Sequence, residues 1–138
     1  MKIKFVDKEN KDFWMSIDTH ADDDGFQNRV YTKTGYVMWE KENPVGLLSY
    51  CVLWDNIPFL NFIFVMDKYR NNGFALQAMK QWEERMREKG YKMVLISTQV
   101  DETAQHFYRK IGYVECGSLL LNNTPLEQPM EMFMRKVL

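Results

Sequence analysis

The fold is constrained most by an apolar, strand-like run that ends in a polar turn and leads directly into an amphipathic segment. Phe59 to Met66 contains one polar residue, Asn61, as expected for a strand buried at the centre of a sheet. Residues 67–73 are mostly polar and end in glycine. From Phe74 to Lys89 apolar residues recur at helical spacing, and Gly90 follows, which predicts a helix that ends there.

Segments with strand or helix periodicity occupy the rest of the chain. Further strands are predicted at residues 2–6, 36–40, 46–54, 93–98, 113–121 and 130–137. A short helix is predicted at 12–19 and another after Asp101 or Thr103, which can cap it, whereas 18–28 indicates a polar loop or a frayed helix. On the long helix, the residues expected to face solvent are Lys80, Glu83, Glu84 and Arg87. This order predicts an α/β domain with a mixed sheet and a right-handed crossover around the long helix.

Composition excludes several classes of protein. The chain has 138 residues and 46% hydrophobic residues, which fits one domain with a sizeable core over residues 1–138. The 18 Lys and Arg residues against 19 Asp and Glu, a net charge of -1, give no support for a nonspecific nucleic-acid binder. No apolar run approaches the roughly 18 residues of a membrane span, and no apolar signal region is expected at the N-terminus.

The cysteines and histidines limit the redox and metal chemistry to be expected. Cys51 and Cys116 lie outside any Cys-x-x-Cys motif, and His20 and His106 have no ligand spacing, so no metal site is expected. Both thiols are predicted to be small core residues in a reducing cytoplasm. His106 is predicted to point off the apolar face of its helix into solvent.

The turn before the long helix has the chemistry of an anion site. The first N–H groups of a helix have no partners within it, and the peptide dipoles leave that end partly positive. Gly73 allows a phosphate to approach the backbone closely, and Arg70 adds a permanent positive charge. The sequence is neither a P-loop nor a GxGxxG dinucleotide motif, and from these residues alone a simple strand-to-helix turn remains the alternative.

Two motifs resemble those of the GNAT N-acetyltransferase family. The first, similar to the family's acyl-CoA signature, is Val65-x-x-x-Tyr69-Arg70-x-x-Gly73-x-Ala75. The second, similar to its helix-to-strand motif, is Ala104-x-x-Phe107-Tyr108-x-Lys110-x-Gly112-Tyr113. They follow each other in the family's order, and the resemblance covers nearly the whole chain in its order of elements. It departs from the pattern at Asp101, where many members have asparagine.

The resemblance implies a fold and an activity. The fold would be a GNAT-like, mostly antiparallel sheet of about six or seven strands, flanked by helices, with a splayed central strand pair. The activity would be acetyl transfer from acetyl-CoA to a primary amine of a small molecule or peptide, by direct attack in a ternary complex and without a metal. A catalytically weak acyl-CoA sensor or interaction module, or an enzyme for a longer acyl donor, are the alternatives.

The resemblance also implies residues for the cofactor. Ile63 and Val65 would bond the pantetheine amides through their main chain, and an N–H near Val65 would polarise the thioester carbonyl. The groups that would cradle the pyrophosphate are those of Arg70, Asn71, Asn72, Gly73, Phe74 and Ala75. Lys110, with Arg109 beside it, could meet the nucleotide phosphates or remain in solvent.

For catalysis, the resemblance assigns Tyr108 as the general acid that protonates the departing thiolate, with a buried packing aromatic as the alternative. A phenol suits this role because its ordinary pKa near 10 keeps it protonated at pH 7. The general base is left open. The start of the central strand has no carboxylate; Asn61 could hold a relaying water, and the other candidates are Glu40, Asp55 and His20.

The acceptor side has two features of note. Asp18, Asp22, Asp23 and Asp24 place four carboxylates within seven residues, which either attract a cationic amine or form a solvated loop. The apolar segment 119–123 could cover the acceptor pocket or pair with a second subunit in a homodimer.

Overall fold

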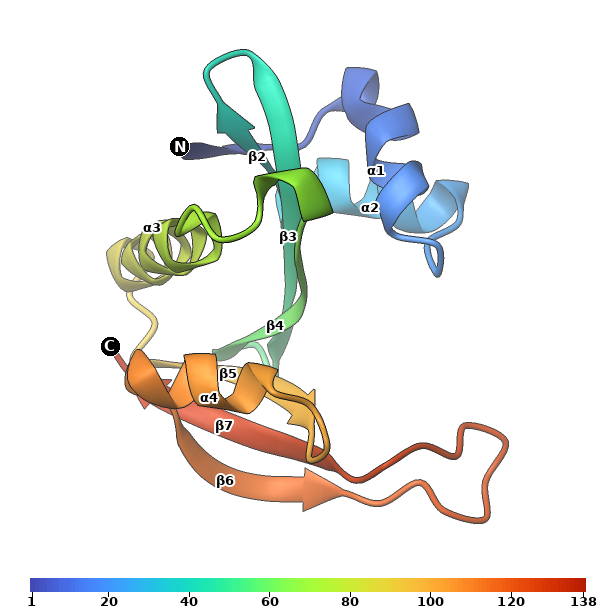
Figure 1. Cartoon of the computed structure of the whole chain (residues 1–138), viewed down its shortest axis with the longest axis vertical. Helices are drawn as coiled ribbons and strands as arrows, with labels where there is room; N and C mark the ends of the chain where they lie inside the picture. Colours follow the sequence, from blue (N-terminus) through green and yellow to red (C-terminus); the bar gives the residue numbers. More distant parts are fainter.

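A single seven-stranded sheet organises the computed structural model, which describes residues 1–138 (Figure 1). The strands are β1 (Lys2–Phe5), β2 (Gly35–Glu40), β3 (Asn43–Leu53), β4 (Ile57–Val65), β5 (Met93–Gln99), β6 (Val114–Leu119) and β7 (Glu131–Val137). The helices are α1 (Lys11–Ile17), α2 (Asp23–Thr32), α3 (Phe74–Glu88) and α4 (Ala104–Lys110), with 3-10 turns η1 (Lys8–Asn10) and η2 (Asp67–Tyr69). The strand order is β1-β2-β3-β4-β5-β7-β6, and β4–β5 alone is parallel. The predicted α/β fold, with a mixed and mostly antiparallel sheet, is confirmed.

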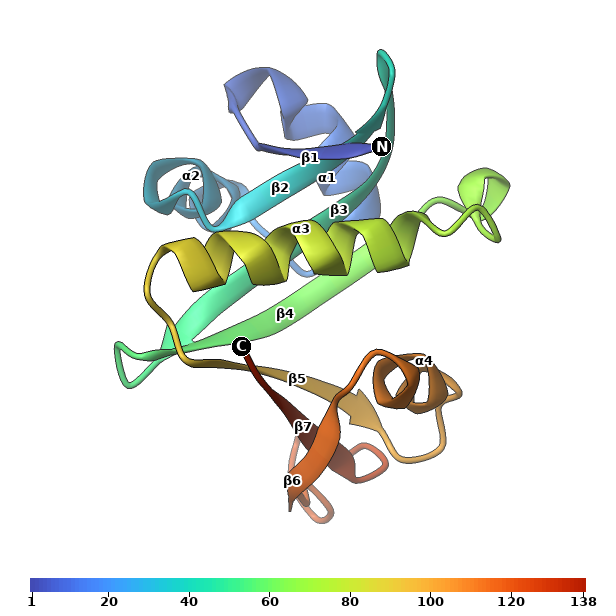
Figure 2. The same cartoon turned by 90° about the vertical axis from the view of Figure 1, so that its left-hand side faces the viewer.

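Helices cover both faces of the sheet. In Figures 1 and 2, α3 crosses one face of β2–β4 while α1 and α2 lie on the other. Because side chains alternate along a strand, β3 sends Leu48 into the main core with Trp82 of α3 and Leu47 into a smaller core with Trp14 and Phe26. Each face of the sheet therefore has its own apolar layer. None of the helices combines the length and apolar character needed to cross a membrane.

The two halves of the sheet meet at one short contact. β4 pairs with β3 along its whole length, but with β5 only through Phe59 and Leu95. Beyond this point β4 and β5 diverge (Figure 2). The predicted splayed central pair is thus present, and the edge of β4 that faces β5 has no strand partner over its C-terminal half.

A β-bulge lies just past the point of divergence. Ser49 pairs with Phe62 and Tyr50 with Leu60, so Asn61 is an extra residue that no β3 residue opposes. Bulges re-aim side chains and increase local twist. Here the bulge turns Asn61 outward on the face covered by α1 and α2, where its Oδ1 accepts a hydrogen bond from Cys51 Sγ at 3.4 Å.

The interpretation of residues 18–28 as a loop or frayed helix is wrong for their second half, because α2 begins at Asp23. Asp22 caps this helix: its Oδ1 accepts a hydrogen bond from Gly25 N at 2.7 Å. Phe26 anchors α2 in the smaller core. The acidic residues, whose sequence is typical of a loop, therefore form the N-cap and the first turn of α2, where negative charge stabilises a helix.

Glu83 was expected in solvent and is instead 4% exposed. Its carboxylate accepts hydrogen bonds from Tyr113 Oη at 2.9 Å and Lys136 Nζ at 2.8 Å. This network joins α3 to β7 and to the residue before β6. Burial of the carboxylate is tolerated because both oxygens are satisfied and Lys136 supplies the opposite charge.

Both cysteines are unpaired, but the prediction that both lie in the core is wrong. Cys116 is exposed, as are all six residues of β6, which is an outer strand of the sheet. Cys51 is only partly buried, since it lies opposite Phe59 near the bulge rather than under a helix.

Glu83→Gln should lower the free energy of unfolding by about 3 kcal/mol, because it leaves the Lys136 ammonium without its counter-charge. Chemical denaturation monitored by tryptophan fluorescence measures this. Glu84→Gln, which alters an exposed pair with Arg87 on the same helix, is the control and should cost less than about 1 kcal/mol. Equal effects of the two substitutions would contradict the role given to the buried network.

Candidate active site

The free edge of β4 presents main-chain groups to the region between the diverging strands. Met66 N donates to Val45 O at 2.9 Å, so the main-chain groups of Met66 face β3. Main-chain direction alternates along a strand, so Phe64 also faces β3 while Ile63 and Val65 face the opposite edge. The two residues predicted to offer main-chain groups to a ligand are thus those whose groups point into the gap.

The turn after β4 is shaped to expose N–H groups. Asn71 and Gly73 have φ of +65° and +74°, and alternating backbone conformations of this kind make a concave run of N–H groups that suits anions. Gly73 is the N-cap of α3 and provides no side-chain cap, so the N–H groups of the first helical turn are free. Asn72 Nδ2 holds the turn closed by donating to Tyr69 O at 3.0 Å and Arg70 O at 3.2 Å.

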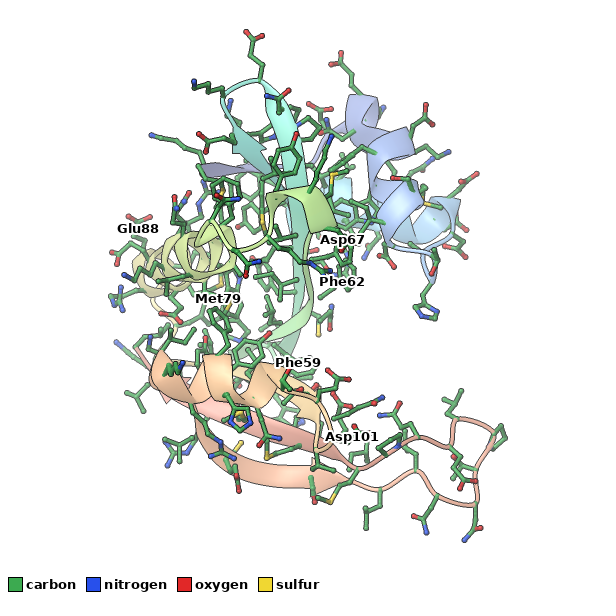
Figure 3. The ribbon with its side chains drawn as sticks, in the orientation of Figure 1. Phe59, Phe62, Asp67, Met79, Glu88 and Asp101 are labelled. Atoms are coloured by element: carbon green, nitrogen blue, oxygen red, sulfur yellow. The ribbon has the colours of Figure 1, made fainter.

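Arg70 folds back onto β4. Its Nε donates to Val65 O at 3.0 Å, its Nη2 lies 3.1 Å from Asp67 Oδ1, and its guanidinium lies over the Phe64 ring at 5.3 Å. The side chain therefore ties the turn to the strand end. In Figure 3, Asp67 marks this turn and Phe59 the region where β4 and β5 meet.

A small cavity of about 140 Å³ brings the two sequence motifs together. It is lined by Val65, Tyr69, Arg70, Asn71, Gly73, Phe74, Ala75, Leu76 and Phe107. Phe107 comes from α4, across the gap from the turn. Lys110 lies three residues later, on the same side of α4 as Phe107; it is exposed and forms no ion pair, whereas Arg109 pairs with Glu115.

Tyr108 follows Phe107 on α4 and is 6% exposed. Its ring packs against those of Phe107 and Tyr113, with centroids 5.3 and 5.7 Å away. Burial, and secondarily the Glu102 carboxylate, raises the pKa of Tyr108 to about 12. Of the two residues predicted to cap α4, Thr103 occupies the N-cap position and Asp101 does not; the Thr103 side chain makes no cap hydrogen bond.

A second cavity, of about 420 Å³, lies on the other face of the sheet and starts at the bulge. Its lining residues are Asp18, His20, Ala21, Asp22, Gly25, Asn28, Arg29, Ser49, Asn61 and Phe62. Two of the candidates for the general base, Asn61 and His20, thus come together. The other two lie elsewhere: Glu40 pairs with the α-amino group of Met1, and Asp55 is in the β3–β4 turn. His106 is exposed, as predicted.

Sequence reasoning missed Asn28, Arg29 and Ser49 at this cavity. Asn28 and Arg29 belong to α2, which the polar sequence concealed, and Ser49 is one small residue in a predicted buried strand. Only the pairing of β3 with β4 brings Ser49 opposite Phe62, beside the bulge. No local pattern in the sequence indicates that juxtaposition.

A sequence model of the acetyltransferase (GNAT) family matches residues 3–113. The chain belongs to this family. The GNAT match confirms the predicted class of enzyme, an acetyl-CoA-dependent acyltransferase. No curated protein sequence matches the chain.

Solved structures of GNAT proteins share the fold at low sequence identity. A ribosomal-protein-alanine N-acetyltransferase from Brucella melitensis is 17% identical with a TM-score of 0.83, covering 100% of both chains. A GNAT family acetyltransferase from Elizabethkingia anophelis with acetyl-CoA bound is 19% identical with a TM-score of 0.77, covering 99% of this chain and 97% of the other. Ard1 from Thermoplasma volcanium is 16% identical with a TM-score of 0.82, again over 99% and 97%.

The buried position of Tyr108 predicts that its phenol stays protonated well above pH 10. In a protein labelled with ¹³C at tyrosine Cζ, the resonance that disappears in Tyr108→Phe should show no phenolate shift at pH 10.5. The raised pKa is the cause, since deprotonation would place an anion in a desolvated site. A midpoint near pH 10 for that resonance would contradict the burial of the hydroxyl.

Proposed function

We propose that residues 1–138 act as one acyltransferase domain that transfers an acetyl group from acetyl-CoA to a primary amine of a small molecule or peptide. The observation that carries this proposal lies where β4 diverges from β5: an unpaired strand edge meets a turn with free N–H groups, and Tyr108 packs against Phe107, which lines the cavity at that turn. Each feature suits a different part of an acyl-CoA: its amides, its pyrophosphate and its thioester.

In this proposal the cofactor replaces the missing strand. Its pantetheine amides bond the main chain of Ile63 and Val65, as a β-strand would. Its pyrophosphate binds the N–H groups of the turn, which runs through Arg70, Asn71, Asn72, Gly73, Phe74 and Ala75. Lys110, free of protein partners, meets a nucleotide phosphate. The adenine lies outside the residues we assign.

Transfer then proceeds in a ternary complex. The neutral amine attacks the thioester carbonyl, whose oxygen is polarised by an N–H near Val65. A C–N bond forms, the C–S bond breaks, and the thiolate takes a proton from Tyr108. A phenol with a pKa of about 12 is a weaker acid than a thiol of about 8.5, so this proton transfer is uphill and is completed when the Tyr108 phenolate takes a proton from water.

The proton lost by the amine goes to water held at Asn61, with His20 as the nearby titratable group. Asn61 has the required place, because the bulge turns it into the cavity beside the gap. It cannot itself accept the proton at neutral pH, which makes it a residue that positions water rather than a base.

The acceptor is proposed at the level of its class. Structural relatives are described as acting on ribosomal-protein alanine, on aminoglycosides at the 6' position and on spermidine or spermine, all of them amines. A cytoplasmic location is retained as part of the proposal because the two cysteines are unpaired. A homodimer is the proposed assembly, because the exposed outer strand β6 and segment 119–123 are available to pair with a second subunit.

One observation favours a second function, a domain that binds acyl-CoA without useful catalysis. The bulge residue is Asn61 rather than a carboxylate, so β4 itself supplies no base to the acceptor cavity. Acetyl-CoA binding without amine-dependent release of CoA would establish this alternative. Amine-dependent release would exclude it.

Gly73→Glu should abolish acetyl-CoA binding, because the new carboxylate would fill and repel the phosphate cradle. Isothermal titration calorimetry with acetyl-CoA measures the loss. Gly90→Glu is the matched control: Gly90 also has a positive φ, +91°, but lies beyond the far end of α3, with nothing within 4 Å of an added Cβ. Unchanged affinity in Gly73→Glu would refute the assignment of this turn.

Tyr108→Phe should lower kcat by about 100-fold, the usual effect of losing general acid catalysis, while the Kd for acetyl-CoA changes less than twofold. Chromatographic measurement of CoA release under saturating acetyl-CoA gives kcat, and calorimetry gives Kd. Tyr31→Phe, at an 88% exposed position, is the control. If kcat is unaffected, Tyr108 only packs the core and water protonates the thiolate.

A further inference from the structure

The cavity at the bulge has a polar lining that the transfer chemistry does not require. Of its lining residues, Asn61 and His20 have a proposed place in the reaction. Asp18, Asp22 and Ser49 also line this 420 Å³ cavity and have no part in the steps above. A cavity of this size holds a small molecule, so these side chains are placed to recognise the part of the acceptor that does not react.

Ser49 points to a ligand independently of the carboxylates. It is 2% exposed, lines the cavity, and its hydroxyl makes no hydrogen bond with the protein. The fully buried side-chain polar atoms that lack a hydrogen-bond partner are Tyr36 Oη and Trp82 Nε1, so the Ser49 hydroxyl is open to the cavity and can bond a molecule there. The facing residue on β4, Phe62, offers a ring and no polar side-chain atom. A polar group of a bound molecule would satisfy Ser49.

Asp18 and Asp22 leave one carboxylate oxygen each available. Asp18 Oδ2 accepts from Trp14 Nε1 at 3.3 Å, and Asp22 Oδ1 accepts from Gly25 N at 2.7 Å. Neither carboxylate has an ion-pair partner, in contrast to Asp23, whose Oδ1 lies 3.1 Å from Lys11 Nζ. The acidic residues therefore lie in different places: Asp18 and Asp22 line the cavity, and Asp23 does not.

Arg29 lines the cavity but forms no ion pair with either aspartate. Its Nη1 donates instead to Tyr50 O at 2.7 Å and to Thr34 Oγ1 at 3.4 Å. His20 also lines the cavity and is exposed. The Phe62 ring adds an apolar wall. Together these surroundings suit an alkyl chain that carries a positive charge.

We propose that this cavity selects a small diamine or polyamine as the acetyl acceptor. The proposal rests on the proposed acetyltransferase function. One amino group, uncharged, reaches the thioester carbon past Asn61. A second, as an ammonium ion, binds the free oxygens of Asp18 and Asp22. The alkyl chain packs on Phe62, and an amine N–H of the ligand donates to Ser49.

The reaction balances with no further reactant. The C–N bond forms as the C–S bond breaks, giving a monoacetylated amine and free CoA. The proton released by the attacking nitrogen goes to solvent, and the thiolate receives one through Tyr108. The second amino group keeps its proton throughout. It contributes to binding and orientation and does not react.

The test compares matched acceptors on the 138-residue chain. With saturating acetyl-CoA, kcat/KM for CoA release is measured with 1,4-diaminobutane, with butylamine, which lacks the second amino group, and with a tetrapeptide that has an N-terminal alanine. We expect 1,4-diaminobutane to exceed butylamine at least 30-fold. Equal values for the two amines, or a preference for the tetrapeptide, would overturn the proposal.

Substitutions then locate the preference in the cavity. Asp18→Asn and Asp22→Asn should each lower kcat/KM for 1,4-diaminobutane at least tenfold, mainly through KM, and change that for butylamine less than twofold. Asn keeps the α2 cap at position 22. Ser49→Ala should raise KM for the diamine about threefold. Asp23→Asn, on the same helix but outside the cavity, is the control. Equal losses for both amines would indicate a structural effect and overturn the proposal.

Binding measurements separate failure of this inference from failure of the proposed function. Calorimetry first determines whether the protein binds acetyl-CoA; no binding would overturn both. Where acetyl-CoA binds, titration of 1,4-diaminobutane into the complex with free CoA tests the cavity without turnover. Binding that is lost in Asp18→Asn and Asp22→Asn but kept in Asp23→Asn supports the proposal. No binding of the diamine overturns it alone.

Discussion

The parting of β4 from β5 is the constraint on which the rest of the structure depends. A single pair, Phe59 with Leu95, joins two halves of one sheet, and the edge that β4 leaves free would ordinarily be closed by another strand. The fold tolerates this because helices and ionic contacts hold the halves together away from the gap. The buried Glu83, bonded to Tyr113 and Lys136, is one such contact, linking α3 directly to the second half of the sheet.

In the proposed complex, the free edge of β4 and the sheet face that carries the bulge would each bind a different molecule. Toward β5, Ile63 and Val65 offer main-chain groups beside the N–H-lined turn. Toward α1 and α2, Asn61 turns into the polar cavity. One strand can therefore hold two molecules on opposite sides of a reacting bond, with little need for loops to close over them. This arrangement explains why the proposed cofactor and acceptor sites share few residues.

Local sequence predicted those parts of the protein that depend on local physics. The apolar run 59–66, the turn at Gly73 and the amphipathic helix after it each have a periodicity or a residue type that short-range rules interpret. The roles of Glu83 and Ser49 were missed because residues distant in sequence decide them. A buried carboxylate looks like a surface one until Tyr113 and Lys136 are placed beside it. The assignment of individual site residues remains a prediction that the experiments above address.

The bond from Arg70 Nε to Val65 O has a consequence for the energetics of ligand binding. A carbonyl oxygen has two lone pairs, so in the proposed complex a ligand N–H would share this acceptor with the charged donor already bonded to it. The guanidinium would then stay next to the N–H groups of the turn and add positive charge where the pyrophosphate is proposed to bind. Strand contact and charge neutralisation would thereby depend on one side chain.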